Sequence, residues 1–263
     1  MMKFRCLLTF ALTCVVCSHT ANTAIAASTN VAVAANFTDA AKEIAAQFKA
    51  KMGHNAILSF GSSGPLTNQI QQGAPFQIFL SADEERPSLL IKDGLALPES
   101  RFTYAIGKIA LWSKDPNGVK GADTLKANAF RKLSIADPNA APYGQAAIEV
   151  LKSLQIYDAI KPKIVMGASI AQAFQFIDTS NAEIGFVALS QITGQFGGSR
   201  WLVPQELYKE IRQDAVLLKN GAQNEAAKAF MVFLKSAETR AMIEKFGYAI
   251  DSELAITNSS ISK

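Results

Sequence analysis

The chain reads Val31-Ala32-Val33-Ala34-Ala35-Asn36-Phe37-Thr38 and, further along, Ile57-Leu58-Ser59-Phe60-Gly61-Ser62-Ser63-Gly64. Each stretch is a short apolar strand that runs into small hydroxyl or amide residues, and a helical pattern begins directly afterwards. These two strand-to-helix junctions predict an α/β fold in which helices start at the ends of sheet strands.

Both junctions are suited to binding an anion. The first backbone N–H groups of a helix have no partner inside the helix, and the helix dipole makes that end positive. An anion is therefore stabilised there without any Lys or Arg. The residues concerned, Asn36, Thr38, Ser62 and Ser63, are also common helix caps, so each junction taken alone is explained equally well by capping.

Two further junctions of the same kind are expected near 137–144 and 167–170, again rich in Gly, Ala, Ser, Asn and Pro. Ligands of open α/β sheets bind beyond the carboxyl ends of the strands, where all four junctions would lie. Small residues there let ligand oxygens approach the backbone amides closely. The coincidence makes an anion site as good an explanation as four unrelated caps.

The first 27 residues have the pattern of a secretory signal peptide. Lys3 and Arg5 give a basic start, an apolar run from Cys6 to Cys17 follows, and Ala24-Ile25-Ala26-Ala27 offers a small-residue cleavage site. All three cysteines lie in this segment, so the mature chain has no disulfide, as expected for a bacterial periplasmic protein. A lipoprotein signal at one of the later cysteines is the alternative, although the preceding residues match a lipobox poorly.

The charge of the mature chain is nearly balanced. The sequence has 26 basic and 22 acidic residues, and removal of the signal takes away two basic ones, which leaves 24 − 22 = +2. Binding to a phosphate backbone needs clustered cations, and no basic run is present. We therefore expect no nucleic-acid partner. No segment after the signal is apolar for long enough to span a bilayer.

Apolar strand patterns alternate with helical patterns through the mature chain, which predicts a mostly parallel α/β sheet. The expected strands are 30–34, 55–59, 77–80, 107–113, 133–136, 163–166, 184–187 and 213–218. The expected helices are 37–52, 64–72, 84–93, 143–155, 169–178, 222–235 and 237–246. Domain boundaries are expected near 106 and 212.

The sequence offers little for catalysis or for metal binding. The turn Gly61-Ser62-Ser63-Gly64 is similar to a hydrolase nucleophile elbow, but it is one residue short of G-x-S-x-G, and His54 is the one histidine outside the signal. A P-loop does not fit because no Lys follows Gly64. One His, no Cys and no carboxylate cluster of calcium-loop spacing leave no metal site. We expect neither an enzyme nor a cofactor.

Six segments together resemble the periplasmic molybdate-binding proteins of ABC uptake transporters. They are AANFTDA (34–40), FGSSG (60–64), GAPFQIFLSAD (73–83), ADPNAAPYG (136–144), EIGFVA (183–188) and FGY (246–248). Any one of them is a weak signal. Their order and spacing are a strong one, and the resemblance runs over essentially the whole mature sequence.

The resemblance implies a type II periplasmic binding protein fold, with two α/β domains whose mixed sheets are flanked by helices. The oxyanion is held in the cleft between them. Domain I is expected to be discontinuous, at 28–106 plus 214–250, and domain II to cover 107–213. A signal peptide at 1–27 precedes them and a C-terminal tail at 251–263 follows.

The resemblance also implies which residues bind the oxyanion. They are Asn36 and Ser63 from domain I, with Ala35 and Ser62 beside them, and Tyr143 and Ile170 from domain II, which would supply backbone N–H groups. Some family members add a tyrosine hydroxyl where this chain has Ala188. We therefore expect Asn36 to complete the coordination, and molybdenum to be bound only as molybdate through these residues.

The function implied is capture of molybdate or tungstate in the periplasm and delivery to the membrane permease of an ABC importer, by a monomer. Several neutral donors offset the lost hydration of a dianion, at about 1.5–3 kcal/mol for each hydrogen bond to a charged group. Cavity size would separate molybdate and tungstate from sulfate, and a lack of acceptors would disfavour protonated phosphate. A receptor for sulfate or a small organic anion is the alternative.

Overall fold

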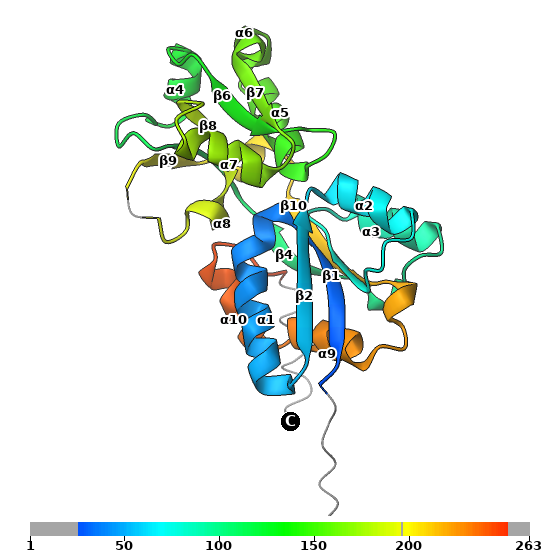
Figure 1. Ribbon diagram of the computed structural model, residues 1–263. Helices are drawn as coiled ribbons and strands as arrows, with labels where there is room; N and C mark the ends of the chain where they lie inside the picture. Colours follow the sequence, from blue (N-terminus) through cyan, green and yellow to red (C-terminus); the bar gives the residue numbers. More distant parts are fainter. Residues whose placement is uncertain (1–25, 196, 252–263) are drawn as a thin grey trace, which may run out of the picture.

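The computed structural model describes residues 26–195 and 197–251. Nearly all of the expected signal peptide and C-terminal tail lie outside these residues. The described chain contains two mixed β-sheets flanked by helices, which lie one above the other in Figure 1. The two-domain α/β fold with mixed sheets that the resemblance implies is confirmed. The mostly parallel sheet predicted from the alternating pattern is wrong, because each sheet has as many antiparallel as parallel strand pairs.

The first sheet has the strand order β2-β1-β3-β10-β4. Strand β1 pairs in parallel with β2 and β3, whereas β10 runs antiparallel to β3 and β4. The strands are β1 (Ser28–Ala34), β2 (Asn55–Gly61), β3 (Ile78–Leu80), β4 (Phe102–Gly107) and β10 (Ile211–Leu217).

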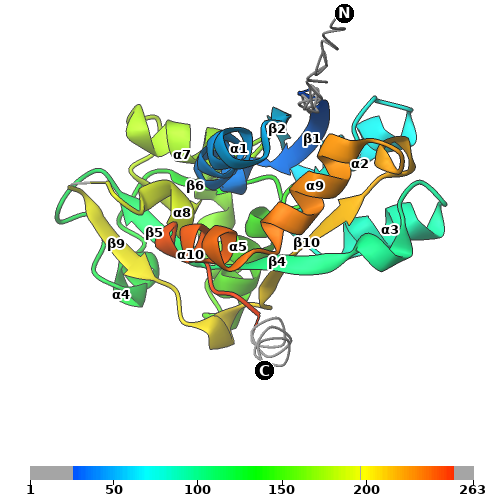
Figure 2. The same ribbon diagram turned by 90° about the horizontal axis from the view of Figure 1, so that it is seen from below.

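Helices bury both faces of the first sheet. Val31 and Val33 of β1 pack into a core with α1 (Thr38–Met52), α9 (Glu225–Leu234) and α10 (Ala237–Lys245). Ala32, which points to the opposite face, packs with α2 (Ser63–Gln71) and α3 (Glu85–Lys92). Figure 2 shows α2 and α3 on the right of the domain and α1 and α10 away from them.

The second sheet has the order β7-β6-β8-β5-β9. Strand β6 runs parallel to β7 and β8, and β5 runs antiparallel to β8 and β9. Its strands are β5 (Ile109–Ser113), β6 (Leu133–Ala136), β7 (Ile164–Gly167), β8 (Ile184–Ala188) and β9 (Ser199–Leu202). Helices α5 (Pro142–Ser153) and α7 (Ile170–Asp178) contact β6 and β8, and the shorter α4 (Ala122–Ala127), α6 (Tyr157–Ile160) and α8 (Leu189–Ile192) complete the domain.

The chain passes between the sheets twice. Lys108 separates β4 in the first sheet from β5 in the second, and residues 203–210 lead from β9 back to β10. The single strand predicted at 107–113 was therefore wrong at its start. Two strands joined by one residue form an unbroken apolar run, so the sequence pattern does not reveal that the chain changes sheets.

The other predicted helices and strands lie within a few residues of those observed, and the strand at 133–136 has the observed bounds. Strand β4 was not predicted as a separate strand, because its apolar pattern continues into that of β5. Strand β9 and helices α4, α6 and α8 were not predicted either, because each is too short for a periodic pattern to stand out. Within the described residues, no helix is long and apolar enough to cross a membrane.

Candidate functional site

A small cavity lies where the two sheets meet, and the structure brings all six residues implied by the resemblance to its wall. It is lined by Ala34, Ala35, Asn36, Ser62, Ser63 and Ala82 from the first domain and by Ala141, Pro142, Tyr143 and Ile170 from the second. These residues follow the carboxyl ends of β1, β2, β3, β6 and β7. The cavity is therefore at the position where α/β sheets bind ligands.

Helices α2 and α5 begin at this cavity without side-chain caps. Ser62 precedes α2 and Ala141 precedes α5, and neither side chain accepts a capping hydrogen bond. By contrast, α9 and α10 start away from the cavity and are capped by Asn224 and Ser236. Capping therefore does not explain the serines at the second junction, and one first-turn N–H group of each helix, that of Ser63 in α2 and that of Tyr143 in α5, stays available to a ligand.

Three open backbone N–H groups line the cavity, those of Ser63 in α2, Tyr143 in α5 and Ile170 in α7, each the first or second residue of its helix. In the part of the chain that the structure describes, none of the three donates to another protein group. Ser169 caps α7 by accepting from the N–H of Gln172, which leaves the N–H of Ile170 open. The cavity is thus lined by donors from both domains.

Ser63 adds a side-chain donor to this set. Its Oγ accepts a hydrogen bond of 2.9 Å from the N–H of Ala82, and the residue is 1% exposed. Because the oxygen is already accepting, the hydroxyl hydrogen is the part that remains for a ligand. Ala82 follows β3, so a third strand end of the first domain orients this serine.

Ser62 has a different role from the one expected. Its hydroxyl donates a hydrogen bond of 2.6 Å to the carbonyl oxygen of Ala168 in the second domain. Nearby, the N–H of Gly64 donates to the carbonyl oxygen of Ala140, at 3.0 Å. The Ser62 hydroxyl therefore joins the two domains at the cavity edge and has no hydrogen left for an anion.

The side chain of Asn36 also points its donors elsewhere. Its Nδ2 donates to Gln213 Oε1 at 2.8 Å and to the Tyr248 hydroxyl at 3.1 Å. The expectation that this amide would replace a tyrosine donor missing at Ala188 therefore needs correction, because both amide hydrogens are used within the protein.

The cavity wall carries no charged side chain. The cavity itself is about 10 Å³, which is the space of about one small group. A drug-sized or sugar-sized molecule does not fit such a space. A wall of neutral donors suits a compact inorganic ion instead.

Three buried tyrosines belong to the site: Tyr143 lines the cavity, Tyr248 hydrogen-bonds to Asn36, and Tyr104 hydrogen-bonds to Gln213. Burial raises the pKa of Tyr104 and of Tyr143 well above the ordinary value, and it also raises the pKa of Tyr248. Their hydroxyls therefore remain protonated near neutral pH and act as hydrogen-bond donors without adding a negative charge close to an anion.

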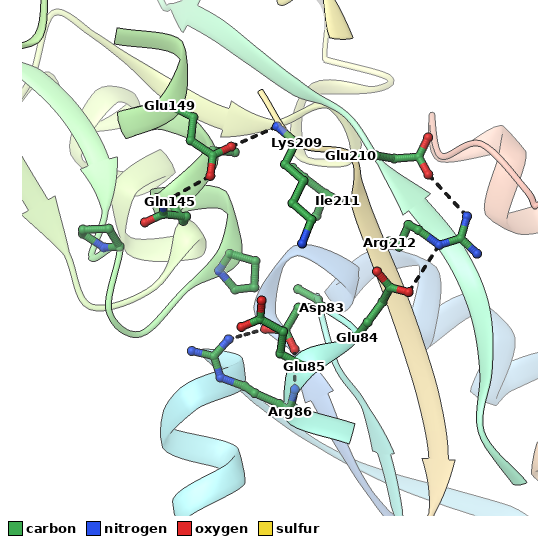
Figure 3. A pocket seen from close by; sticks show the side chains of 14 residues that line it. Asp83, Glu84, Glu85, Arg86, Gln145, Glu149, Lys209, Glu210, Ile211 and Arg212 are labelled. Carbon is green, nitrogen blue, oxygen red and sulfur yellow. Dashed lines mark hydrogen bonds and ion pairs between the residues drawn. The ribbon is translucent and has the colours of Figure 1, made fainter. Parts of the chain in front are cut away.

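A larger groove of about 350 Å³ adjoins the cavity, and the two share Ala82 and Pro142 as walls. Figure 3 shows Asp83 turned toward Arg86, Arg212 between Glu84 and Glu210, and the side chain of Lys209 pointing into the groove. Its acidic residues are Asp83, Glu84, Glu85, Glu149 and Glu210, against the basic Arg86, Lys209 and Arg212.

This excess of carboxylates makes the groove a poor site for an anion, and most of its charged groups are already paired with each other. We therefore assign the functional site to the smaller, uncharged cavity. As for metal ions, residues 26–195 and 197–251 contain no group of three or more His, Cys, Asp or Glu side chains that could hold one.

Sequence reasoning missed several residues of the site. Ala82 was missed because its junction, between β3 and α3, was not recognised as a fifth strand end at the cavity. Gln213, Tyr248 and Ser190 were missed because they act through side-chain contacts with residues distant in sequence. Two signals were available: Gln213 begins the strand predicted at 213–218, and Tyr248 lies in the segment FGY (246–248).

A family model described as "Bacterial extracellular solute-binding protein" matches residues 29–249, most of the chain. This chain belongs to the bacterial extracellular solute-binding proteins. Within them it is 53% identical to the molybdate-binding protein ModA of Rhodobacter capsulatus, over 84% of this chain and 87% of that protein. It is also 53% identical to ModA of Azotobacter vinelandii, over 86% of this chain and 91% of that protein.

A solved structure also supports the similarity of this solute-binding protein to molybdate-binding proteins. The periplasmic molybdate-binding protein of Azotobacter vinelandii superposes with a TM-score of 0.82 at 40% identity, and the match covers 85% of this chain and 99% of that one. The resemblance to periplasmic molybdate-binding proteins of ABC transporters, predicted from the six sequence segments, is confirmed.

Proposed function

We propose that this solute-binding protein captures molybdate and tungstate in the periplasm and delivers them to the membrane permease of an ABC importer. One observation carries the proposal: uncharged donors from both domains, the N–H groups of Ser63, Tyr143 and Ile170 and the Ser63 hydroxyl, surround a single small cavity. The names of the two relatives at 53% identity support molybdate as the ligand.

The chemistry of the donors explains why an oxyanion would bind. A dianion that leaves water loses its hydration, and each oxygen left unpaired would be costly. Donors at helix N-termini replace that hydration, and the helix dipoles add a favourable field.

Protonated phosphate would be disfavoured because its O–H needs an acceptor. The donors of the cavity wall are N–H groups and the Ser63 hydroxyl, whose oxygen already accepts from Ala82. Size would select between the remaining dianions, because the donors come from both domains and their spacing would match one size of ion. An ion as small as sulfate would leave some donors unpaired.

A thermal-shift and calorimetry panel on the mature protein tests the proposal, with molybdate, tungstate, sulfate, phosphate and chromate. A ligand at 100 times its Kd stabilises the native state by about 2.7 kcal/mol, so molybdate and tungstate should raise the Tm strongly. Absence of a shift with both ions would refute the proposal. A shift with sulfate alone would favour the alternative receptor.

A further inference from the structure

Gln213 is a fully buried polar side chain in strand β10, with 0% exposure. Its Oε1 accepts from Asn36 Nδ2 at 2.8 Å and from the Tyr104 hydroxyl at 3.2 Å. Its Nε2 donates to the Tyr143 hydroxyl at 3.2 Å. One amide group therefore holds two of the residues that line the cavity.

These two residues come from different domains. Asn36 follows β1 in the first domain, and Tyr143 lies in the first turn of α5 in the second. Strand β10, which carries Gln213, begins directly after the second crossover between the sheets. Gln213 Nε2 holds the hydroxyl of Tyr143, and Gln213 Oε1 holds the side chain of Asn36 in the 3₁₀ turn Ala35–Phe37, the Asn36 loop. The start of α5 and its N–H group are therefore held at a set distance from the Asn36 loop.

Tyr248 and Ser190 also hold the Asn36 loop. The backbone carbonyl oxygen of Asn36 accepts from the Tyr248 hydroxyl at 2.8 Å and from Ser190 Oγ at 2.9 Å. In a trans peptide the carbonyl and the following N–H point in opposite directions. Fixing this carbonyl therefore also fixes the direction of the N–H of Phe37.

The packing at Gly107, the last residue of β4, shows how closely the pair Gln213 and Tyr143 fits. A Cβ at position 107 would lie 2.2 Å from the Tyr143 hydroxyl and 2.6 Å from Gln213 Nε2. The space that a side chain would fill is occupied by this hydrogen-bonded pair. A glycine at this position therefore permits the contact between the domains.

We infer that Gln213 is a positioning residue for oxyanion binding: it sets the spacing between the Asn36 loop and the first turn of α5, and through that spacing the size of ion that is accepted. The inference rests on the proposed function. An amide suits this place because it accepts from two donors and donates to a third group while staying neutral beside an anion.

The test compares Gln213→Met, which keeps the volume and removes all three hydrogen bonds, with the wild type. Kd values for molybdate are measured by calorimetry, those for sulfate by competition, and Tm values without ligand. We expect molybdate binding about 10- to 100-fold weaker, since buried partners are left unpaired. Sulfate binding should change less, so the preference for molybdate over sulfate should fall.

Ser113→Ala is the matched control for lost stability. Ser113 is also buried and is the last residue of β5. Its Oγ donates to the carbonyl oxygen of Glu183. This variant should lower the Tm and keep the wild-type ion preference. If Gln213→Met does not fold, Gly107→Ala, which displaces the same pair from the other side, should show the same loss of preference.

Unchanged molybdate affinity in Gln213→Met, within about twofold of wild type, would overturn the positioning role, since a lost buried hydrogen bond exceeds that factor. An equal loss for both ions, in proportion to stability as in Ser113→Ala, would also overturn it. If the wild type binds neither ion, the proposed function itself fails. The two failures are therefore distinguishable.

Discussion

The hydroxyl of Ser62 lies 2.6 Å from the carbonyl oxygen of Ala168, and this hydrogen bond joins the two domains at the edge of the cavity. Its neighbour Ser63 points its oxygen at the N–H of Ala82 within the first domain and keeps its hydrogen for the cavity. Two adjacent serines thus have separate roles. One holds the domains together, and the other is positioned to contact the ligand.

Replacing Ser62 by Ala should weaken molybdate binding modestly, by about 0.5–1.5 kcal/mol, the net contribution of a typical hydrogen bond. The lost hydrogen bond, from Ser62 to Ala168, joins the two domains. Its removal should therefore mainly raise the rate at which molybdate dissociates. Stopped-flow measurement of both rates checks this. Ser59→Ala, at an exposed serine of β2, is the control and should match the wild type.

Replacing Ser63 by Ala should cost more, about 1–3 kcal/mol, because an oxygen of the buried anion loses its donor. Calorimetry with molybdate and tungstate gives the value. The order of the two variants is the informative result. An affinity loss in Ser63→Ala no larger than that in Ser62→Ala would contradict the assignment of Ser63 as a ligand.

Molybdate affinity should change little between low and moderate NaCl concentrations. The cavity wall has no charged side chain, so the bound ion forms no exposed ion pair with the protein that salt would screen. Titrations over a range of NaCl concentrations at constant pH check this. A steep decrease in affinity with salt would indicate that Arg or Lys side chains of the neighbouring groove take part.

Stability should decrease in alkaline solution. Burial raises the pKa of Tyr104, Tyr143 and Tyr248 in the folded protein, whereas an unfolded tyrosine titrates near about 10. Below that pH both states are protonated and these groups leave the free energy of unfolding constant. Above it the unfolded chain loses protons first, so the free energy of unfolding should fall as pH rises.

Denaturant titrations at several pH values measure this effect, and Tyr248→Phe should reduce the slope above pH about 10. The same variant removes the hydroxyl that contacts Asn36, so it should also weaken molybdate binding at neutral pH. A slope identical to that of the wild type would mean that Tyr248 does not contribute to the alkaline transition.

Phe230→Ala tests the core of the first domain away from the cavity. Phe230 is 0% exposed, and its ring packs edge-on against Phe48 of α1, with centroids 5.1 Å apart. Loss of a large buried ring typically lowers the free energy of unfolding by about 3–5 kcal/mol. Folded variant protein should bind molybdate like the wild type, and a large change in Kd would show that this core is coupled to the site.

Much of the fold could be predicted from local patterns. The buried face of α9, including Phe230 and Met231, follows from helical periodicity and is observed. The junctions around Asn36, Ser63, Tyr143 and Ile170 were found because a strand end, small residues and a helix start are neighbours in sequence. Strand β4 was missed because its apolar pattern continues into β5.

The sequence by itself determined the alternation of strands and helices, the four small-residue junctions and the absence of Lys and Arg from them. The tertiary structure decided which donors remain free. Ser62 reaches Ala168, and Asn36 reaches Gln213 and Tyr248, across separations of 106, 177 and 212 residues. Backbone conformation depends mostly on near neighbours, whereas the direction of a buried hydrogen bond depends on whichever partner the packed fold places beside it.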